Sequence, residues 1–249
     1  MRVGPDDRLG SSAYASVLLL AARGASTRSM KVSEAVTSRR SIRQFTDQPV
    51  ELEKLRRVLD TARWSASGCN FQPWEAAVVT GDSLKELQAK IAKNGPQKPE
   101  YDWTAPEQED AYKSRLHAVG AGMFGAMGIA RDDAEGRAAA MARNANSFDA
   151  PVVMFTYFPR FMKEPQWSDT GMWLQTVALL LREEGLDSCY QEFMALYANT
   201  IRDHLGLDHE RYMLFCGMAI GYRDADAPLN NFERERVPLD EHVSFHGFE

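Results

Sequence analysis

Arginines are concentrated in the stretch SRRSIRQF, residues 38–45, of a chain that is acidic overall. Arg39, Arg40 and Arg43 stand close together with Ser41 among them, and no acidic residue lies between them. A guanidinium group matches two phosphate oxygens at once, and a serine hydroxyl adds a further donor. This stretch therefore predicts a phosphate site. The alternative is a solvated basic helix end, which the helix dipole also favours.

A second arginine pair lies near the end of the chain, in the stretch NNFERERVP. Arg234 and Arg236 alternate there with Glu233 and Glu235. Alternate residues of an extended chain share a face, so both arginines can point one way and both glutamates the other. The pair would complete the same phosphate site. A salt-bridged surface tail is the alternative.

A third stretch, SASGCNFQPW at residues 65–74, combines small and amide side chains. At Ser67 and Gly68 a turn would let backbone approach a ligand closely, and Asn70 and Gln72 each carry a donor and an acceptor. A planar heterocycle with alternating carbonyls and ring nitrogens needs that mixture. The alternative is an ordinary loop whose amides bond the local backbone.

The stretch AVGAGMFGAMG, residues 118–128, contains the spacing G-x-G-x-x-G of a dinucleotide-binding loop. That loop follows a buried strand. Here the preceding residues are charged, with Tyr112, Leu116 and Val119 at helical intervals, as on an exposed helix. We therefore interpret the glycines as a flexible or closely packed connection and not as a nicotinamide site.

Composition restricts the function classes further. The chain has 249 residues, 44% hydrophobic and 26% charged, with a net charge of -6. This balance offers no general attraction to nucleic acid or to an anionic membrane. The three cysteines are far apart with no C-x-x-C spacing, so we expect no metal site, no disulfide framework and a cytoplasmic location.

Hydrophobic periodicity predicts one α+β domain with helices around a mixed sheet. A helix at 51–64 would bury the stripe Leu52, Leu55, Val58, Leu59 and Ala62. The polar, proline-rich segment 94–106 is typical of an excursion or lid. The other expected helices are 32–39, 83–91, 132–145 and 168–185, the last capped by Ser168 or Asp169, and the expected strands are 75–80, 150–158 and 212–222.

The first thirty residues contain a short apolar run at 14–26 that only weakly matches a signal peptide. It is also far too short to span a bilayer. We expect residues 1–30 to form a disordered or loosely attached extension. Residues 31–249 would form the single domain, with a lid excursion near 94–128 and no membrane segment.

Taken together, these stretches resemble the FMN-dependent nitroreductase family in content and order. R-R-S-x-R follows the first helix, S-G-x-N-x-Q-P-W follows the second, and GLDSCYQE follows a buried helix. The chain ends in GYRDADAP and then RERVP. The resemblance spans about residues 32–245.

The resemblance implies a three-layer fold with a mixed central sheet, assembled as an intertwined homodimer with FMN held noncovalently at the subunit interface. The partner subunit would supply Ser67, Gly68 and Asn70. The backbone of Gln191, Glu192 and Phe193 would lie beside the flavin N5. The phosphate, ribityl chain and pyrimidine edge would be held by Arg39, Arg40, Ser41, Arg43, Arg234 and Arg236. Cys69, Phe71 and Tyr190 depart from the family pattern, which affects the polarity of the pocket.

The activity that the resemblance implies is ping-pong reduction. NADPH or NADH would pass a hydride to FMN and leave, and a nitroaromatic or quinone would then accept the electrons. Arg43 would stabilise the anionic reduced flavin, and no side chain is named as catalytic because protons can come from water. The candidate lid residues are Tyr101, Trp103, Tyr112, Phe124 and Met127. The alternative is that these side chains only pack the surface excursion.

Three alternatives stay open. A dehalogenase of the iodotyrosine deiodinase type or a flavin-cleaving enzyme would share the scaffold and differ in the lid. A flavin-binding protein without turnover would not bleach with NADPH or NADH. A Rossmann dehydrogenase would use nicotinamide without flavin.

Overall fold

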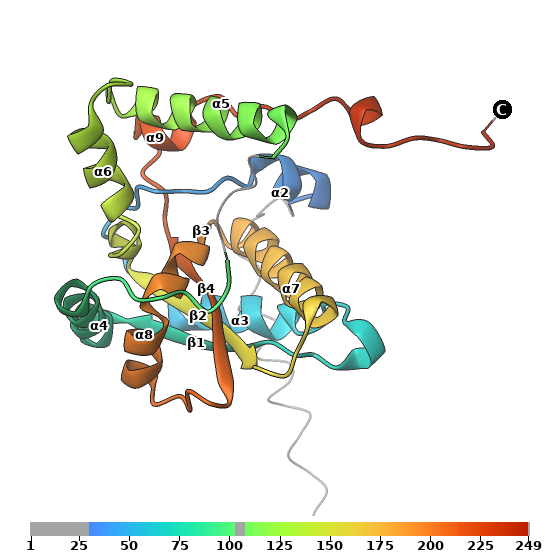
Figure 1. Cartoon of the computed structure of the whole chain (residues 1–249). Coiled ribbons are helices and arrows are strands. Elements are labelled where there is room, and N and C mark those ends of the chain that lie inside the picture. The colour runs from blue at the N-terminus through green and yellow to red at the C-terminus, as the bar shows by residue number, and fades with distance from the viewer. Residues whose placement is uncertain (1–29, 103–107, 249) are drawn as a thin grey trace, which may run out of the picture. The chain divides into compact units, whose positions relative to one another are not determined.

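Antiparallel strands form the sheet of this computed structural model, which describes residues 30–102 and 108–248. The strands of this described part are β1 (Glu75–Thr80), β2 (Val152–Pro159), β3 (Asp187–Gln191) and β4 (Tyr212–Gly221), in the spatial order β1-β2-β4-β3 (Figure 1). All three pairings are antiparallel. The α+β class is therefore confirmed. The expected mixed sheet is not found among the described strands, and the parallel pairing in this part is one isolated bridge between Ser41 and Ser188.

β2 is buried along its whole length, as its apolar sequence predicts. Val152 and Met154 face one core cluster, whereas Val153 and Phe155 face another. Successive side chains of a strand point to opposite faces of the sheet, so helices must cover both faces. The sheet is thus the middle layer of three.

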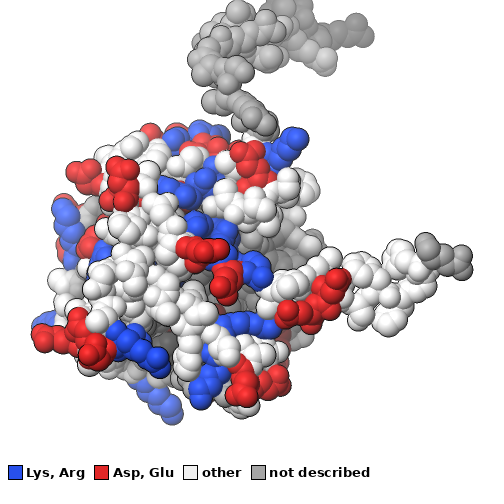
Figure 2. All heavy atoms as spheres, turned by 90° about the horizontal axis from the view of Figure 1, so that it is seen from above, with Lys and Arg blue, Asp and Glu red and all other residues white. Residues whose placement is uncertain are grey.

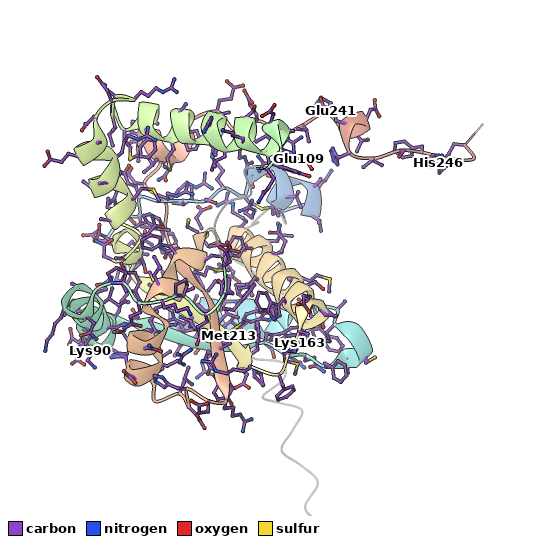
Figure 3. All side chains as sticks on the ribbon, viewed as in Figure 1. Lys90, Glu109, Lys163, Met213, Glu241 and His246 are labelled. Atoms are coloured by element: carbon purple, nitrogen blue, oxygen red, sulfur yellow. The ribbon has the colours of Figure 1, made fainter. Side chains whose placement is uncertain are left out.

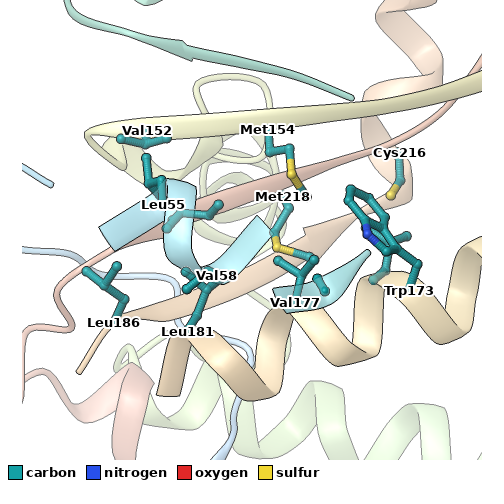
Figure 4. Close-up of a cluster of buried hydrophobic side chains, with 13 residues drawn as sticks. Leu55, Val58, Val152, Met154, Trp173, Val177, Leu181, Leu186, Cys216 and Met218 are labelled. Atoms are coloured by element: carbon teal, nitrogen blue, oxygen red, sulfur yellow. The ribbon is translucent and has the colours of Figure 1, made fainter. Parts of the chain in front are cut away.

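One face of the sheet is covered by α3 (Leu52–Ala62) and α7 (Glu164–Glu183). In Figure 4 Leu55 and Val58 of α3 and Val177 of α7 gather under the strands. The apolar stripe expected on α3 is partly wrong, because Leu52 in its first turn is 59% exposed whereas Leu55 is 5% exposed.

The other face is covered by α4 (Gly81–Asn94) and α8 (Ala198–Leu205). Leu87 and Ile201 are fully buried there. The 3-10 helix η3 (Glu192–Tyr197) also crosses this face. A Cβ on Gly217 of β4 would lie 2.8 Å from Met194 Cγ, so glycine at this position allows η3 to lie directly on the strand.

α7 begins one turn earlier than its sequence suggests. Its N-cap is Lys163 and Pro165 stands in its first turn, a position that proline tolerates. The expected caps Ser168 and Asp169 are therefore wrong. Asp169 is buried instead, and its Oδ1 accepts a hydrogen bond of 3.0 Å from the backbone N–H of Gly68.

Among the elements that were absent from the sequence-based expectation are β3 and α8. β3 has the sequence DSCYQ, which shows no apolar alternation, and it is a strand because it pairs with β4. α8 is short, with only eight residues, and follows η3 directly. Both depend on tertiary contacts more than on local pattern.

The remaining helices lie at one end of the sheet, above the strands in Figure 1. They are α2 (Val32–Ser38), α5 (Asp110–Ala126), α6 (Ala134–Ala142) and α9 (Pro228–Asn231), with short 3-10 turns η1 (Gly68–Asn70), η2 (Ser147–Asp149) and η4 (Leu239–Glu241) elsewhere. α5 packs on α9, and in Figure 1 the two helices lie side by side. Val32–Glu249 forms one compact unit.

The glycines Gly120, Gly122 and Gly125 all lie inside α5. They follow a helical segment and not a strand, so the described structure contains no dinucleotide loop at this place. The expected connection is therefore wrong, because these glycines continue a helix. Close packing holds at Gly122, where a Cβ would lie 3.0 Å from Phe232 Cδ2, whereas a Cβ on Gly120 or Gly125 would meet nothing within 4 Å.

Several expectations concern residues outside the described part. Residues 1–29, which make up almost all of the expected N-terminal extension, and the lid candidate Trp103 belong to this group. No helix among the described residues is long and apolar enough to cross a membrane. In this described part Cys69, Cys189 and Cys216 are free thiols, and no cluster of metal-ligating side chains occurs.

Candidate functional site

An extended segment carries the first arginine cluster from the end of α2 to the edge of β3. Ser41 bridges to Ser188 in parallel register, and the Ile42 N–H donates to Ser188 O at 3.1 Å. Ile42 is fully buried. This burial fixes the segment, so the arginines on either side of Ile42 have a defined backbone position.

The second arginine pair lies against the first, although nearly the whole chain separates them. Arg234 donates through Nη2 to Thr37 O at 2.8 Å and through Nη1 to Arg39 O. Arg40 donates to Phe232 O in return and lies over the Phe232 ring, 5.4 Å from its centroid. The structure therefore brings two of the three sequence clusters together.

These arginines carry positive charge that the chain does not neutralise. Burial, followed by the nearby Arg223 and Arg236, lowers the pKa of Arg40. Burial and then Arg236, Arg40 and Arg39 lower the pKa of Arg234. Within residues 30–102 and 108–248, no carboxylate lies within 4.0 Å of the guanidinium groups of Arg39, Arg40, Arg43, Arg234 or Arg236.

Neighbouring arginines with a structural role are paired. Arg182 Nη1 lies 2.9 Å from Asp187 Oδ2, and Arg223 makes two hydrogen bonds of 2.6 Å to the same carboxylate. The arginines of the cluster, by contrast, have no carboxylate partner among the described residues, and Arg40 and Arg234 donate to backbone oxygens instead.

Two large cavities and one small cavity adjoin the cluster. One, of about 690 Å³, lies between α5 and the C-terminal segment and is lined by Arg234 and Arg236, and also by Glu233 and Glu235. The expected separation of arginines and glutamates onto two faces is therefore incomplete. The other, of about 1040 Å³, is lined by Arg43 together with α5 and α6. Figure 2 looks at this side of the molecule, where basic side chains gather in the middle of the surface.

Arg43 occupies the junction between the extended segment and the larger cavity. Its backbone N–H donates to Asn230 Oδ1 at 3.0 Å, and its Nη1 donates to Ser41 O at 3.4 Å. Its guanidinium lies 5.9 Å from the centroid of the Phe148 ring. Arg43 thus lies on the wall of the larger cavity, with its backbone held by Asn230.

The end of β3 lies beside the same site. Gln191 is 2% exposed and donates through Nε2 to Asn144 O at 2.9 Å. Asn144 and Arg43 line a common small cavity of about 150 Å³. Glu192 and Phe193 follow Gln191 directly at the start of η3. Sequence reasoning missed Asn144, because a single asparagine after an alanine-rich helix carries no spacing signal.

The third cluster lies elsewhere in the chain. Ser67 precedes the turn η1, which begins at Gly68 and in which Cys69 and Asn70 have φ of 49° and 57°. Asp169, in the first half of α7, holds this loop, whereas Arg182, near the other end of α7, donates to Ser38 Oγ at 3.5 Å. Arg182 follows Asp169 by thirteen positions, which corresponds to about 20 Å along the helix. One chain therefore does not bring this loop to the arginines.

The lid candidates occupy different environments. Tyr101 is not at a free surface: it donates to Phe215 O and packs edge-on against Trp167, with ring centroids 5.5 Å apart. Burial raises its pKa well above the usual value. Phe124 lines the larger cavity and Met127 the small one, while Tyr112 is exposed on α5.

A family model for the nitroreductase family matches residues 36–222, about three quarters of the chain. The chain belongs to the nitroreductase family. The matched residues include the first arginine cluster, the loop at residues 65–74 and all four strands, whereas Arg234 and Arg236 lie beyond them.

Other nitroreductases support this membership. The chain is 32% identical to a 4-nitrobenzoate reductase of Pseudomonas putida over 216 residues, 86% of this chain and 95% of that protein. A crystal structure of the FMN and NADPH-dependent nitroreductase NfnB from Sphigopyxis sp. strain HMH has a TM-score of 0.84 at 44% identity, covering 88% of this chain and 100% of that one.

A third relative is the FMN-dependent nitroreductase NfnB from Mycobacterium smegmatis, solved in complex with NADPH. It has a TM-score of 0.80 at 26% identity, covering 86% of this chain and 96% of that one. The nitroreductase fold expected from the sequence is thus confirmed over most of the chain.

Proposed function

We propose that this nitroreductase is an FMN-dependent enzyme that takes reducing equivalents from NADPH or NADH and reduces nitroaromatic or quinone-type acceptors in ping-pong order. The observation that carries the proposal is the unpaired arginine cluster beside two cavities, in a chain that is similar to reductases of 4-nitrobenzoate and to FMN and NADPH-dependent enzymes. FMN, when bound, supplies the redox chemistry.

The residues present fit the phosphate of FMN. The lowered pKa values of Arg40 and Arg234 reflect burial and mutual repulsion of like charges, and a phosphate dianion among them would relieve that repulsion. The adjoining cavities have the size expected of a small-molecule site, which is about 300–1,000 Å³. The residues proposed to hold the cofactor within one chain are Arg39, Arg40, Ser41, Arg43, Arg234 and Arg236, with the backbone of Gln191, Glu192 and Phe193.

Arg43 would contribute electrostatic stabilisation. Asn230 holds its backbone and Ser41 O accepts from its Nη1, so its charge would already lie beside the cavity when negative charge develops there. We assign no side chain as a general acid or base, since water can supply the protons. The expected chemical role of the chain is therefore to bind, orient and stabilise charge.

We further propose a homodimer with the cofactor at the subunit interface. Ser67, Gly68 and Asn70 would then come from the partner subunit, which resolves the separation of about 20 Å along α7. The loop offers donors on an exposed surface, and its neighbours Trp64 and Phe71 are 80% and 59% exposed. Exposed aromatic groups of this size favour a protein interface.

The C-terminal segment gives independent support for association. Leu239, Phe245 and Phe248 are 55%, 61% and 82% exposed. Figure 3 shows Glu241 and His246 on this segment, which extends past the end of α5 near Glu109. Burial of such exposed apolar side chains is favourable, and we propose that they are buried against a second copy of the chain.

An anaerobic visible spectrum before and after NADPH tests the function. We expect a flavin spectrum that bleaches with NADPH and recovers on adding a nitroaromatic or a quinone. Absence of flavin, with none bound after adding FMN, would contradict the proposal. Bound flavin that never bleaches indicates a binding protein, while halotyrosine turnover or oxygen-dependent loss of FMN indicates the dehalogenase or flavin-cleaving alternative.

Subunit complementation tests the shared site. Arg236→Ala and Asn70→Ala would each impair activity alone. In a mixed dimer, one site carries both changes and the other carries neither, so an equal mixture that has exchanged subunits should recover about a quarter of wild-type activity. A mixture that exchanges subunits but recovers nothing would show that both residues serve the same chain's site.

A further inference from the structure

The larger cavity is lined by further basic side chains besides Arg43 of the arginine cluster. Its wall between α5 and α6 includes Arg131 and Arg137, and His117 also lines it. The rest of this wall is mainly apolar. No Asp or Glu is among the described residues that line the cavity.

Arg137 is held in a defined orientation. Its guanidinium carbon lies 4.0 Å from the centroid of the Phe124 ring, and Phe124 is 7% exposed. A guanidinium stacked on a ring still has its N–H edge available, and that edge matches two oxygens of a carboxylate or a phosphate. Stacking therefore orients Arg137 without using its donors.

The acidic residues nearby do not neutralise this pair. Three acidic residues lie close by in the sequence: Asp132 and Asp133 just before α6, and Glu135 in its first turn. None of them lines the cavity. Asp133 caps α6, accepting through Oδ1 from the Gly136 N–H at 2.8 Å. Among the described residues, no carboxylate lies within 4.0 Å of the guanidinium of Arg131 or Arg137.

We propose that Arg137, assisted by Arg131, is a specificity-determining anion subsite that binds a charged oxygen group of a reactant entering this cavity. The shared chemistry is a planar or tetrahedral oxyanion, and its two possible sources are the carboxylate of an acidic nitroarene and the 2′-phosphate of NADPH. This inference rests on the proposed function, because it specifies the reactants of the same cavity that Arg43 lines.

The test compares charged and uncharged reactants of the same shape. Arg137→Gln and Arg131→Gln are measured by anaerobic stopped flow in each half-reaction separately. Enzyme reduction is followed with NADPH and with NADH, and reoxidation with 4-nitrobenzoate and with neutral 4-nitrobenzamide. Arg211→Gln is the matched control, because Arg211 also lies over an aromatic ring, that of Tyr212 at 5.1 Å, but does not line the cavity.

We expect Arg137→Gln to reduce the second-order rate constant for the anionic member of at least one pair by about tenfold or more, the effect of one lost charge-assisted hydrogen bond. The uncharged or 2′-hydroxyl member should change less than about twofold. Arg131→Gln should act in the same direction but more weakly, because Arg131 is exposed. The pair that responds identifies the source of the anion.

Equal losses for both members of each pair, or no loss in either pair, would overturn the subsite. Flavin content and the rate with NADH in the wild-type enzyme provide the separate check on the proposed function. A wild-type protein that holds no flavin rejects that function, whereas a fully flavinylated, NADH-active Arg137→Gln enzyme without charge discrimination rejects only the subsite.

Discussion

The buried carboxylate of Asp187 holds the guanidinium of Arg223 by two hydrogen bonds of 2.6 Å each. The same carboxylate also accepts from Arg182. Asp187 is 1% exposed, so its charge would be costly to bury without these partners. It joins the end of α7 to the start of β3 and to the segment after β4, immediately behind the unpaired arginines.

Asp187→Asn should therefore be strongly destabilising. It leaves two partly buried guanidinium groups without their counter-ion, which we expect to cost about 3 kcal/mol in the free energy of unfolding. Urea unfolding followed by circular dichroism measures this. The control is Asp60→Asn, which removes an exposed ion pair with Arg63 and should cost less than about 1 kcal/mol. Similar values for the two variants would contradict the structural role of Asp187.

Arg236→Ala should weaken FMN retention. Loss of one charge-assisted partner of a phosphate costs about 1.5–3 kcal/mol, which corresponds to a rise in the FMN dissociation constant of about tenfold to a hundredfold. Titration of apoprotein with FMN, followed by flavin fluorescence, measures it. Arg56→Ala, on the exposed side of α3, should bind FMN as wild type does. Full flavin occupancy of Arg236→Ala at low added FMN would reject the assignment.

Two glycines of α5 offer a matched pair. A Cβ on Gly125 meets nothing within 4 Å, so Gly125→Ala should stabilise the helix by about 0.5–1 kcal/mol. A Cβ on Gly122 would lie 3.0 Å from the Phe232 ring, which also lies beneath the Arg40 guanidinium. Gly122→Ala should therefore stabilise the protein less than Gly125→Ala does, or should destabilise it. Melting temperatures of the two variants measure the difference, and an equal gain would show that α5 does not pack tightly on Phe232.

Two leucines of α3 test the orientation of that helix. Leu55→Ala removes a side chain that is 5% exposed and should cost about 2–5 kcal/mol, whereas Leu52→Ala, at 59% exposure, should change stability by less than about 0.5 kcal/mol. Chemical unfolding of both variants is the measurement. A large loss at Leu52 would mean that a partner subunit covers it, which size-exclusion chromatography of the same variant can check.

The local sequence pattern was sufficient to predict a strand that is buried at every position. The apolar run at residues 150–158 predicted β2, because a strand covered on both faces needs apolar residues at every position. It was insufficient for β3, whose DSCYQ sequence is a strand because β4 supplies its hydrogen bonds. The cap of α7 was misplaced for a similar reason, since Asp169 serves the loop at Gly68 and not its own helix start.

The sequence by itself determined the α+β class, the positions of most helices and strands, the family resemblance and the arginines that form the candidate site. These features depend on residue types and on hydrophobic periodicity, both of which can be read directly from the amino-acid sequence. The tertiary structure alone decided that Arg234 lies against Thr37 and Arg39, that Asp187 pairs with both Arg182 and Arg223, and that Asn144 and Arg137 reach the cavities. Such relationships join residues far apart in the chain, and only packing specifies which charges are paired and which stay available for a ligand.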